Sequence, residues 1–116
     1  SEYCMKQSDT IYLRHILDAL TTIERYITDV DEETFFRESL IQDGVIRQMM
    51  IIGEAVKQLT PATRQQAPHI TWSAIAGMRD KLIHHYFGID LSQVWLTTKD
   101  DLPILKMAVA TILAKR

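Results

Sequence analysis

An eight-residue segment, Arg79-Asp-Lys-Leu-Ile-His-His-Tyr86, holds the densest group of reactive side chains in the sequence. It combines a guanidinium, a carboxylate, an ammonium, two imidazoles and a phenol. An imidazole titrates near neutral pH, so it can give up or take a proton, and a planar guanidinium stabilises negative charge through paired hydrogen bonds. Such a set can supply proton transfer and charge stabilisation in one place.

Helical spacing, at about 100° per residue, would place four of these side chains on one broad face: Arg79, Asp80, His84 and Tyr86. Arg79 and His84 are about 140° apart, so they can converge only through the reach of the arginine, a distorted last turn or a symmetry-related copy. Asp80 precedes His84 by four residues, which allows a hydrogen bond that favours the charged imidazole. This face could be presented to solvent, to a subunit or to a substrate.

A metal site is not predicted from these residues. His84 and His85 point about 100° apart, and no two histidines have the four-residue spacing of the helical zinc motif. Cys4 is the only cysteine, which excludes an intrachain disulfide and a cysteine-based zinc site and is typical of a reducing, cytoplasmic compartment. The paired Glu-x-x-His motifs of di-iron bundles are also absent from the sequence. We therefore expect no metal and no cofactor.

Composition limits the class of protein. With 116 residues, 47% hydrophobic and 24% charged, the chain is typical of one soluble globular domain. No apolar run approaches the roughly 20 residues of a membrane span, so no membrane partner is expected. A net charge of −2 argues against a protein that holds nucleic acid by charge alone, so stable DNA binding is not expected. An enzyme that binds nucleic acid transiently remains compatible with this net charge.

Helical periodicity runs through most of the chain, and no segment alternates with the period of a strand. We expect residues 1–7 to form a tail and residues 8–116 to form one helical domain. Ser8 or Asp9 is expected to cap the first helix, and Asp100 or Asp101 to start the last. The predicted helices cover 8–28, 34–59 with a kink allowed near Gly44, 72–87, 91–98, and the C-terminal segment. The prediction is an all-α antiparallel bundle of four long helices with additional short ones.

The pattern Arg79-x4-His84-x-Tyr86 resembles the motif of the HEPN superfamily, and specifically of the HepT-like ribonuclease toxins. The flanking segments resemble the same family in the same order along the chain: Ile51-Ile-Gly-Glu-Ala55, Trp72-x-x-Ile75-x-Gly-Met-Arg79, Val94-Trp95 and Asp101-Leu-Pro103-x-Leu105.

This resemblance implies an all-α homodimer in which two motif helices meet across a cleft. It implies a metal-independent endoribonuclease that cuts RNA by attack of a ribose 2′-OH, with Arg79 and His84 as catalytic residues and Asp80 in support. It also implies a type VII-like toxin–antitoxin pair. The partner would be a minimal nucleotidyltransferase antitoxin of the MntA type, which transfers AMP onto Tyr86.

Simpler interpretations of the same residues stay open. Arg79 could pair with a neighbouring carboxylate, His84 could favour the helix C-terminus, and Tyr86 could be a packing aromatic. Glu54 lies inside an apolar helix and is expected to form a supporting ion pair, with an arginine of the motif helix as one candidate. The alternative function is a non-catalytic HEPN dimer that serves as an accessory or nucleotide-binding subunit of a nucleotidyltransferase.

Other conspicuous residues are expected to be structural or solvated. His15 lies on a polar helix face and His69 in a connector, so both should be exposed. Met49, Met50, Trp72 and Trp95 should belong to the core or to an interface rather than to a cofactor site.

Overall fold

Helices form every element assigned in the part of the chain that the structure describes. The computed structural model describes the backbone of residues 2–84 and 88–116, and the side chains of residues 8–82 and 88–116. The elements are α1 (Glu2–Ile27), α2 (Glu32–Arg37), α3 (Ser39–Lys57), α4 (Pro61–Arg64), α5 (Trp72–His84), α6 (Leu91–Leu96), the π-helix η2 (Thr97–Asp101) and α7 (Leu102–Ala114). The predicted all-α class is confirmed. Among the described residues, no helix combines the length and the apolar content needed to cross a bilayer.

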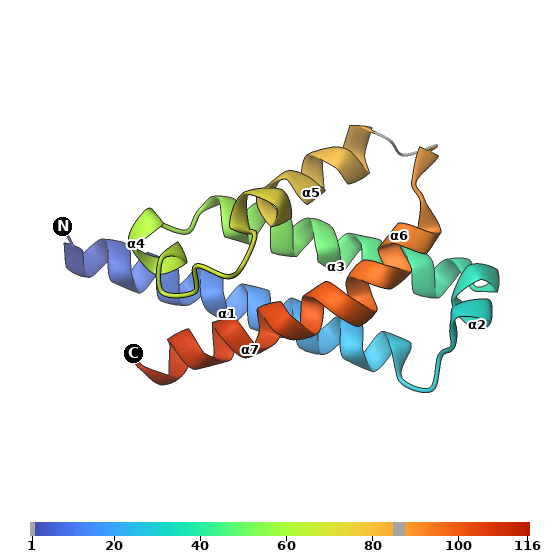
Figure 1. The fold of residues 1–116 in the computed structure, drawn as a ribbon, viewed down its shortest axis with the longest axis horizontal. Helices are drawn as coiled ribbons and strands as arrows, with labels where there is room; N and C mark the ends of the chain where they lie inside the picture. Colours follow the sequence, from blue (N-terminus) through green and yellow to red (C-terminus); the bar gives the residue numbers. More distant parts are fainter. Residues whose placement is uncertain (1, 85–87) are drawn as a thin grey trace.

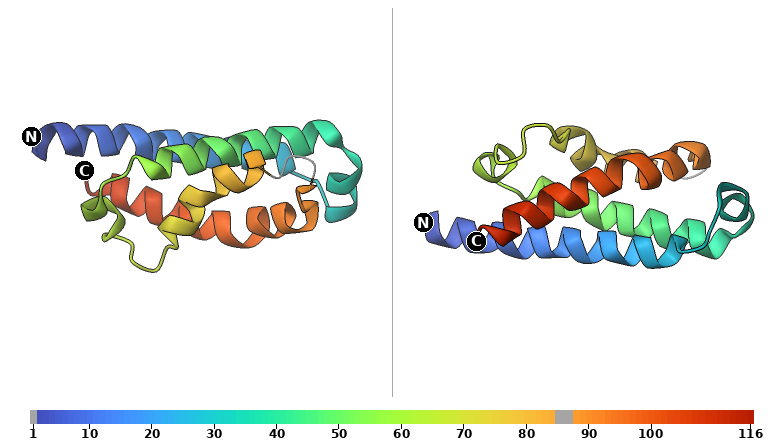
Figure 2. Two further views of the ribbon diagram at one scale, coloured as in Figure 1. Left: turned by 90° about the horizontal axis from the view of Figure 1, so that it is seen from above. Right: turned by 60° about the horizontal axis from the view of Figure 1, so that its bottom comes forward.

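The helices pack around one core that α1 and α3 share with α7. α1 lies along α3, α7 crosses α1, and α5 packs on the outer side of α3 (Figure 1, Figure 2). Apolar residues recur at helical spacing on each inward face, which is why these helices bury one side each. Buried members include Leu13, Ile16, Leu20 and Ile23 of α1, Val45, Met49, Ile52 and Val56 of α3, and Leu105, Val109 and Ile112 of α7.

Side-chain caps set the starts of three short helices. Asp31 accepts a hydrogen bond from the backbone N of Thr34 at 2.8 Å at the start of α2, and Thr60 caps α4 ahead of Pro61. Asp90 accepts one from the backbone N of Ser92 at 3.0 Å and caps α6.

The long central helix predicted over 34–59 is wrong in one respect, because two helices occupy this stretch. The helical path breaks at Glu38, whose φ of −104° and ψ of 95° are those of an extended residue. Gly44, where a kink had been allowed, lies inside α3. A Cβ atom there would be 3.0 Å from Cε2 of Tyr26, so this glycine makes room for an aromatic ring of α1.

One predicted helix start is also corrected. α1 begins at Glu2, so Asp9 lies inside the helix and does not cap it. The predicted start of the last helix is confirmed, because α7 begins at Leu102, directly after Asp101. Asp101 makes no side-chain capping bond there, since the chain runs from α6 through η2 into α7. Thr98 supports the π-helical turn by donating its hydroxyl hydrogen to the backbone O of Val94 at 2.9 Å. α5 is described to His84, and the rest of the predicted 72–87 helix lies outside the described residues.

Asp9 instead forms a buried polar link between α1 and the segment that follows α3. Only 2% of this residue is exposed. Its carboxylate accepts hydrogen bonds from the hydroxyl of Thr60 at 2.5 Å, from the backbone N of Thr60 at 3.2 Å and from the hydroxyl of Thr63. The guanidinium of Arg116 donates to Oγ1 of Thr63 at 2.9 Å, so the end of the chain joins the same network.

We predict that Asp9→Asn lowers the free energy of unfolding by about 1.5–3 kcal/mol, because the amide loses charge-assisted bonds and brings an unpaired donor into a buried site. Urea unfolding of the purified protein measures this. Asp18→Asn is the matched control, since Asp18 is an exposed residue of the same helix. Equal losses for the two variants would contradict a stabilising role of the Asp9 network.

Candidate active site

Helix α5 carries the described part of the motif. Arg79 and Asp80 lie in its C-terminal half, and His84 is its last residue. The side chain of His84 is not among those described, and Tyr86 lies outside the described residues. The geometry of the site is therefore that of Arg79, Asp80 and the residues of α3 beside them.

Gly53 allows α5 to approach α3 closely at Arg79. A Cβ atom at Gly53 would lie 3.1 Å from both the backbone N and the Cβ of Arg79, and 3.1 Å from the carbonyl O of Ile75. Contacts this short cannot be relieved by turning a flexible side chain, because two of the three atoms belong to the backbone of α5. The glycine therefore fixes the distance between the two helices at the site.

Arg79 is held by carboxylates from both helices. Its Nε lies 2.9 Å from Oε2 of Glu54 on α3, and its Nη1 lies 3.3 Å from Oδ1 of the adjacent Asp80. An ion pair of this kind was expected from the apolar sequence around Glu54, although the Glu54 side chain itself is exposed. About a third of the arginine side chain, 37%, stays exposed, so the guanidinium can still meet a ligand from solvent.

Asp80 is in turn held by Lys57, the last residue of α3. Nζ of Lys57 lies 3.2 Å from Oδ2 and 3.3 Å from Oδ1 of the carboxylate. Hydrogen bonding to Lys57 is the main cause that lowers the pKa of Asp80 below its ordinary value, and the charge of Arg79 acts in the same direction. Asp80 is therefore a carboxylate at neutral pH, and it can accept hydrogen bonds but cannot donate one.

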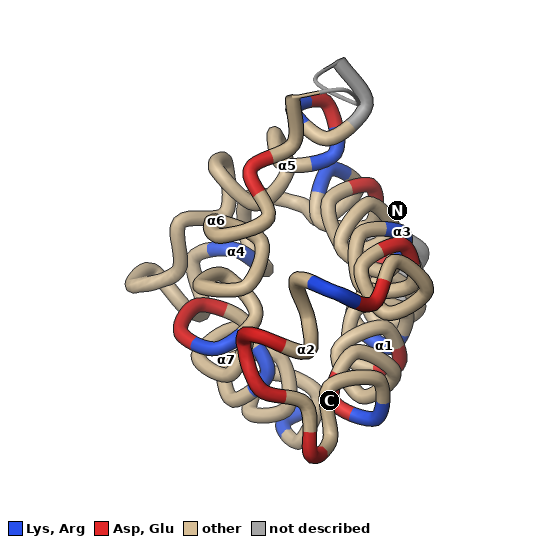
Figure 3. The backbone as a smooth tube through the Cα atoms, turned by 90° about the vertical axis from the view of Figure 1, so that its right-hand side faces the viewer, with Lys and Arg blue, Asp and Glu red and all other residues tan. Residues whose placement is uncertain are grey.

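The four side chains alternate in sign along the α3–α5 contact, in the order Glu54, Arg79, Asp80, Lys57. Figure 3 shows positively and negatively charged residues adjoining where α5 passes α3. Lys57 was not predicted from the sequence as part of this site. The signal for it was its position three residues after Glu54, since this spacing places both side chains on one face of α3.

A guanidinium has five N–H donors, and Glu54 and Asp80 engage two of them among the described residues. Donors therefore remain for a bidentate contact with a phosphate or carboxylate. No group of three or more His, Cys, Asp or Glu side chains that could hold a metal ion occurs in the searched, described part of the chain.

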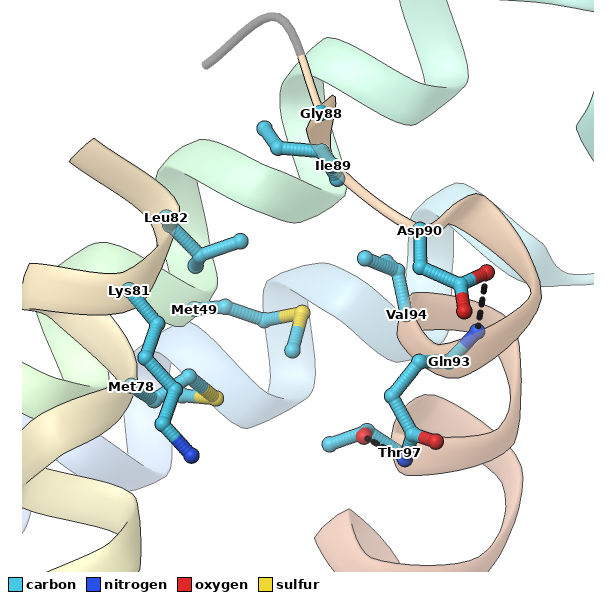
Figure 4. Close-up of a pocket in the computed structure, with 10 residues that line it drawn as sticks. All are labelled: Met49, Met78, Lys81, Leu82, Gly88, Ile89, Asp90, Gln93, Val94 and Thr97. Atoms are coloured by element: carbon cyan, nitrogen blue, oxygen red, sulfur yellow. Dashed lines mark hydrogen bonds between the residues drawn. The ribbon is translucent and has the colours of Figure 1, made fainter. Parts of the chain in front are cut away.

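An apolar pocket of about 220 Å³ lies on the other flank of α5, between this helix and α6. Its lining, shown in Figure 4, includes Met49, Met78, Leu82, Ile89 and Val94, with Lys81, Asp90, Gln93 and Thr97 among its polar residues. Arg79 and Asp80 do not line it. The cavity is thus separate from the charged network, because Lys81 is about 200° from Arg79 around the helix.

The remaining residues singled out in the sequence are where they were expected. Met49, Trp72 and Trp95 are buried in the core, and Met50 is partly buried. Both His15 and His69 are exposed, and the ring of His15 meets that of Tyr12 edge to face, with centroids 6.2 Å apart.

Comparison with known proteins places the chain in a family. A family model described as "Ribonuclease HepT-like" matches residues 16–112, which include Glu54, Lys57 and the whole motif segment. The chain belongs to the HepT-like ribonuclease family. No solved structure matches the chain.

Three curated relatives illustrate the similarity. A protein of Methanocaldococcus jannaschii named "Gamma-glutamylcyclotransferase and putative RNase" is 44% identical over 94% of this chain, and the chain spans about half, 49%, of that relative's length. A "Probable ribonuclease HepT" of Thermococcus cleftensis is 42% identical over 88% of this chain and 93% of its own length. A "Putative RNase" of Caldanaerobacter subterraneus is 38% identical over 90% of this chain and 93% of its own length.

Alanine substitution of Gly53 on α3 tests the close contact, and substitution of Gly77 on α5 is the matched control. Gly53→Ala should lower the free energy of unfolding by about 1–3 kcal/mol, because the new methyl group overpacks the α3–α5 contact. Gly77→Ala should raise it by up to about 1 kcal/mol, because nothing lies within 4 Å of its added Cβ and alanine favours the helix. Thermal or urea unfolding compares the two variants, and a Gly53→Ala protein as stable as the wild type would refute the close contact.

Proposed function

We propose that the protein is a metal-independent endoribonuclease that cuts RNA with Arg79 and His84, and that Asp80 supports them. The proposal rests first on the placement of Arg79. Its guanidinium is partly exposed and held by two carboxylates, and Arg79 lies on α5, which is described to His84. Membership of the HepT-like ribonuclease family supports the reaction class.

The reaction that these residues suit is an internal transfer at phosphorus. The 2′-oxygen of a ribose forms a bond to the adjacent phosphorus while the bond from phosphorus to the 5′-oxygen breaks. One group takes the proton of the 2′-OH and another protonates the departing 5′-oxygen, and imidazole can do either. The products are a 2′,3′-cyclic phosphate and a 5′-OH. Arg79 would bind the phosphoryl oxygens, on which negative charge builds up.

A homodimer with its two α5 helices facing each other would complete this site. At about 100° per residue, positions 79 and 84 are about 140° apart around one helix, so one protomer is not expected to bring both residues to the same phosphate. A two-fold axis beside the Arg79 face brings a second Arg79 and a second His84 to the same cleft. One imidazole can then act as base and the other as acid.

We predict that the pure protein cleaves RNA in the presence of EDTA, since proton transfer and charge stabilisation both come from side chains. Arg79→Ala and His84→Ala should each lower the cleavage rate by roughly 100-fold or more. Arg25→Ala serves as control, because Arg25 is an exposed arginine at the far end of α1. Gel analysis of total RNA and of a defined oligonucleotide provides the measurement.

Two results would contradict this mechanism. Cleavage that stops in EDTA and returns with Mg²⁺ would show that a metal ion supplies the chemistry. A dimer that leaves RNA intact but binds a nucleotidyltransferase would favour the alternative function, an accessory or nucleotide-binding subunit.

We further propose that the protein is the toxin of a toxin–antitoxin pair and that the antitoxin is a minimal nucleotidyltransferase. In the inhibiting step the phenolic oxygen of Tyr86 bonds to the α-phosphorus of ATP, pyrophosphate leaves and the phenolic proton is released. Tyr86 follows Arg79 by seven residues, two helical turns, so on a continued helix it would lie on the Arg79 face. The added phosphate could then pair with Arg79, and the nucleotide would occupy the path of an RNA backbone.

Tyr86→Phe should escape this inhibition, because it keeps the aromatic ring and removes only the acceptor oxygen. The variant should sediment as the same dimer as the wild type and cleave RNA equally well, but stay active after incubation with the nucleotidyltransferase and ATP. Mass spectrometry should find AMP on the wild type alone. AMP on another residue, or a variant that is still silenced, would overturn the assignment of Tyr86.

A further inference from the structure

A second hollow lies between α1 and α3, beside Glu54. Its volume is about 410 Å³, and its lining residues are Tyr12 and His15 of α1, Ile51, Glu54 and Ala55 of α3, and Gln58 directly after α3. The two helices lie side by side along this stretch, and α5 packs on the side of α3 that faces away from α1 (Figure 2). The volume is within the range of small-ligand sites, about 300–1,000 Å³.

Glu54 connects this hollow with the motif. The same carboxylate that lines the hollow lies 2.9 Å from Nε of Arg79. A phosphate bound by the guanidinium would therefore be next to whatever occupies the hollow. A substrate that extends from Arg79 towards α1 would enter it.

The lining has the chemistry of a site for a flat heterocycle. The rings of Tyr12 and His15 stand edge to face, at 85°, and Ile51 and Ala55 add apolar surface from α3. Aromatic and apolar surfaces bind the faces of nucleobases in single-stranded RNA. Glu54 and Gln58 add polar groups that can bind the edge of a base.

The carboxylate of Glu54 makes the hollow selective among nucleobases. An ionised carboxylate only accepts hydrogen bonds and has about four lone-pair positions, so the contact with Arg79 leaves acceptor capacity on Glu54. Adenine, cytosine and guanine carry an exocyclic amino group that can donate to it. Uracil has no such group, and its single N3–H lies between two carbonyl oxygens that repel a carboxylate. An acceptor at this edge therefore discriminates against uracil, because it leaves the uracil carbonyls without a donor.

We propose that this hollow binds the nucleobase beside the phosphate that Arg79 holds, and that it selects bases with an exocyclic amino group. The inference rests on the proposed ribonuclease function and deepens it, since it assigns the residues that choose the cleavage position. Tyr12 and His15 bind the faces of the base, and Glu54 and Gln58 read its edge.

Direct binding tests the site without catalysis. AMP and UMP are titrated separately into the protein while the side-chain NMR signals of Tyr12 and His15 are followed. AMP should shift both signals and bind about 5-fold or more tightly than UMP. Glu54→Gln should reduce this preference, because an amide can also donate to a uracil carbonyl.

Two pairs of variants separate a role in binding from a role in folding. Tyr12→Ala should weaken AMP binding by roughly 5- to 150-fold, the range for loss of one stacked base, while Tyr12→Phe should bind normally. His15→Ala should also weaken AMP binding. His69→Ala, which removes another exposed histidine that lies outside the hollow, should leave AMP binding unchanged. The same His15→Ala variant should lose the preference among flanking bases when oligonucleotides are cleaved.

The outcomes distinguish this inference from the proposed function. Cleavage without AMP-dependent shifts at Tyr12 and His15 overturns the base site and leaves the ribonuclease proposal standing. Base-selective shifts without cleavage support the site and overturn the ribonuclease. If His15→Ala and Tyr12→Ala weaken dimerisation and no nucleotide shifts either signal, the hollow is covered by a second copy and the inference is wrong.

Discussion

Because Gly53 has no side chain, the backbone of α5 packs directly against α3 at Arg79. A methyl group at that position would lie 3.1 Å from the backbone N of Arg79 and from the carbonyl O of Ile75, so any other residue would push the helices apart. The ion pair between Arg79 and Glu54 depends on this spacing, since its 2.9 Å distance joins one helix to the other. The orientation of the guanidinium relative to the bundle is thus set by a backbone contact.

Electroneutrality of the α3–α5 network has consequences for how a phosphate would bind. Glu54 and Asp80 offset the charges of Arg79 and Lys57, so these four residues alone create little attraction at long range. Binding must depend on short-range donors that remain on the guanidinium, or on an exchange of one carboxylate for the phosphate. This agrees with a whole-chain charge of −2, which gives nucleic acid no general affinity for the surface. Selection by a neighbouring base contact would then contribute more to specificity than charge.

Periodicity predicted the helical class and the buried stripes because burial of one helix face leaves a direct trace in the sequence. The cap at Asp90 was predictable for a similar reason, since its partners are two and three residues away. The break at Glu38 was not, because neither glycine nor proline marks it. Asp9 resembled a helix cap, and only its distant partners Thr60 and Thr63 explain its burial. Lys57 was missed because its contact with Asp80 spans 23 residues.

The bonds of Asp9 and the contact between Lys57 and Asp80 both act on the C-terminal end of α3. Asp9 binds Thr60 and Thr63, directly beyond the turn that carries Lys57, and so ties the end of α3 to α1. On its other side, the same part of α3 contacts α5 through Gly53. Glu54 lies between the two constraints, on a segment held from both sides. Because the backbone that carries Glu54 is held in this way, its carboxylate can orient the guanidinium of Arg79 before a ligand arrives. Such prior orientation is the condition for electrostatic stabilisation that is ready before a reaction begins.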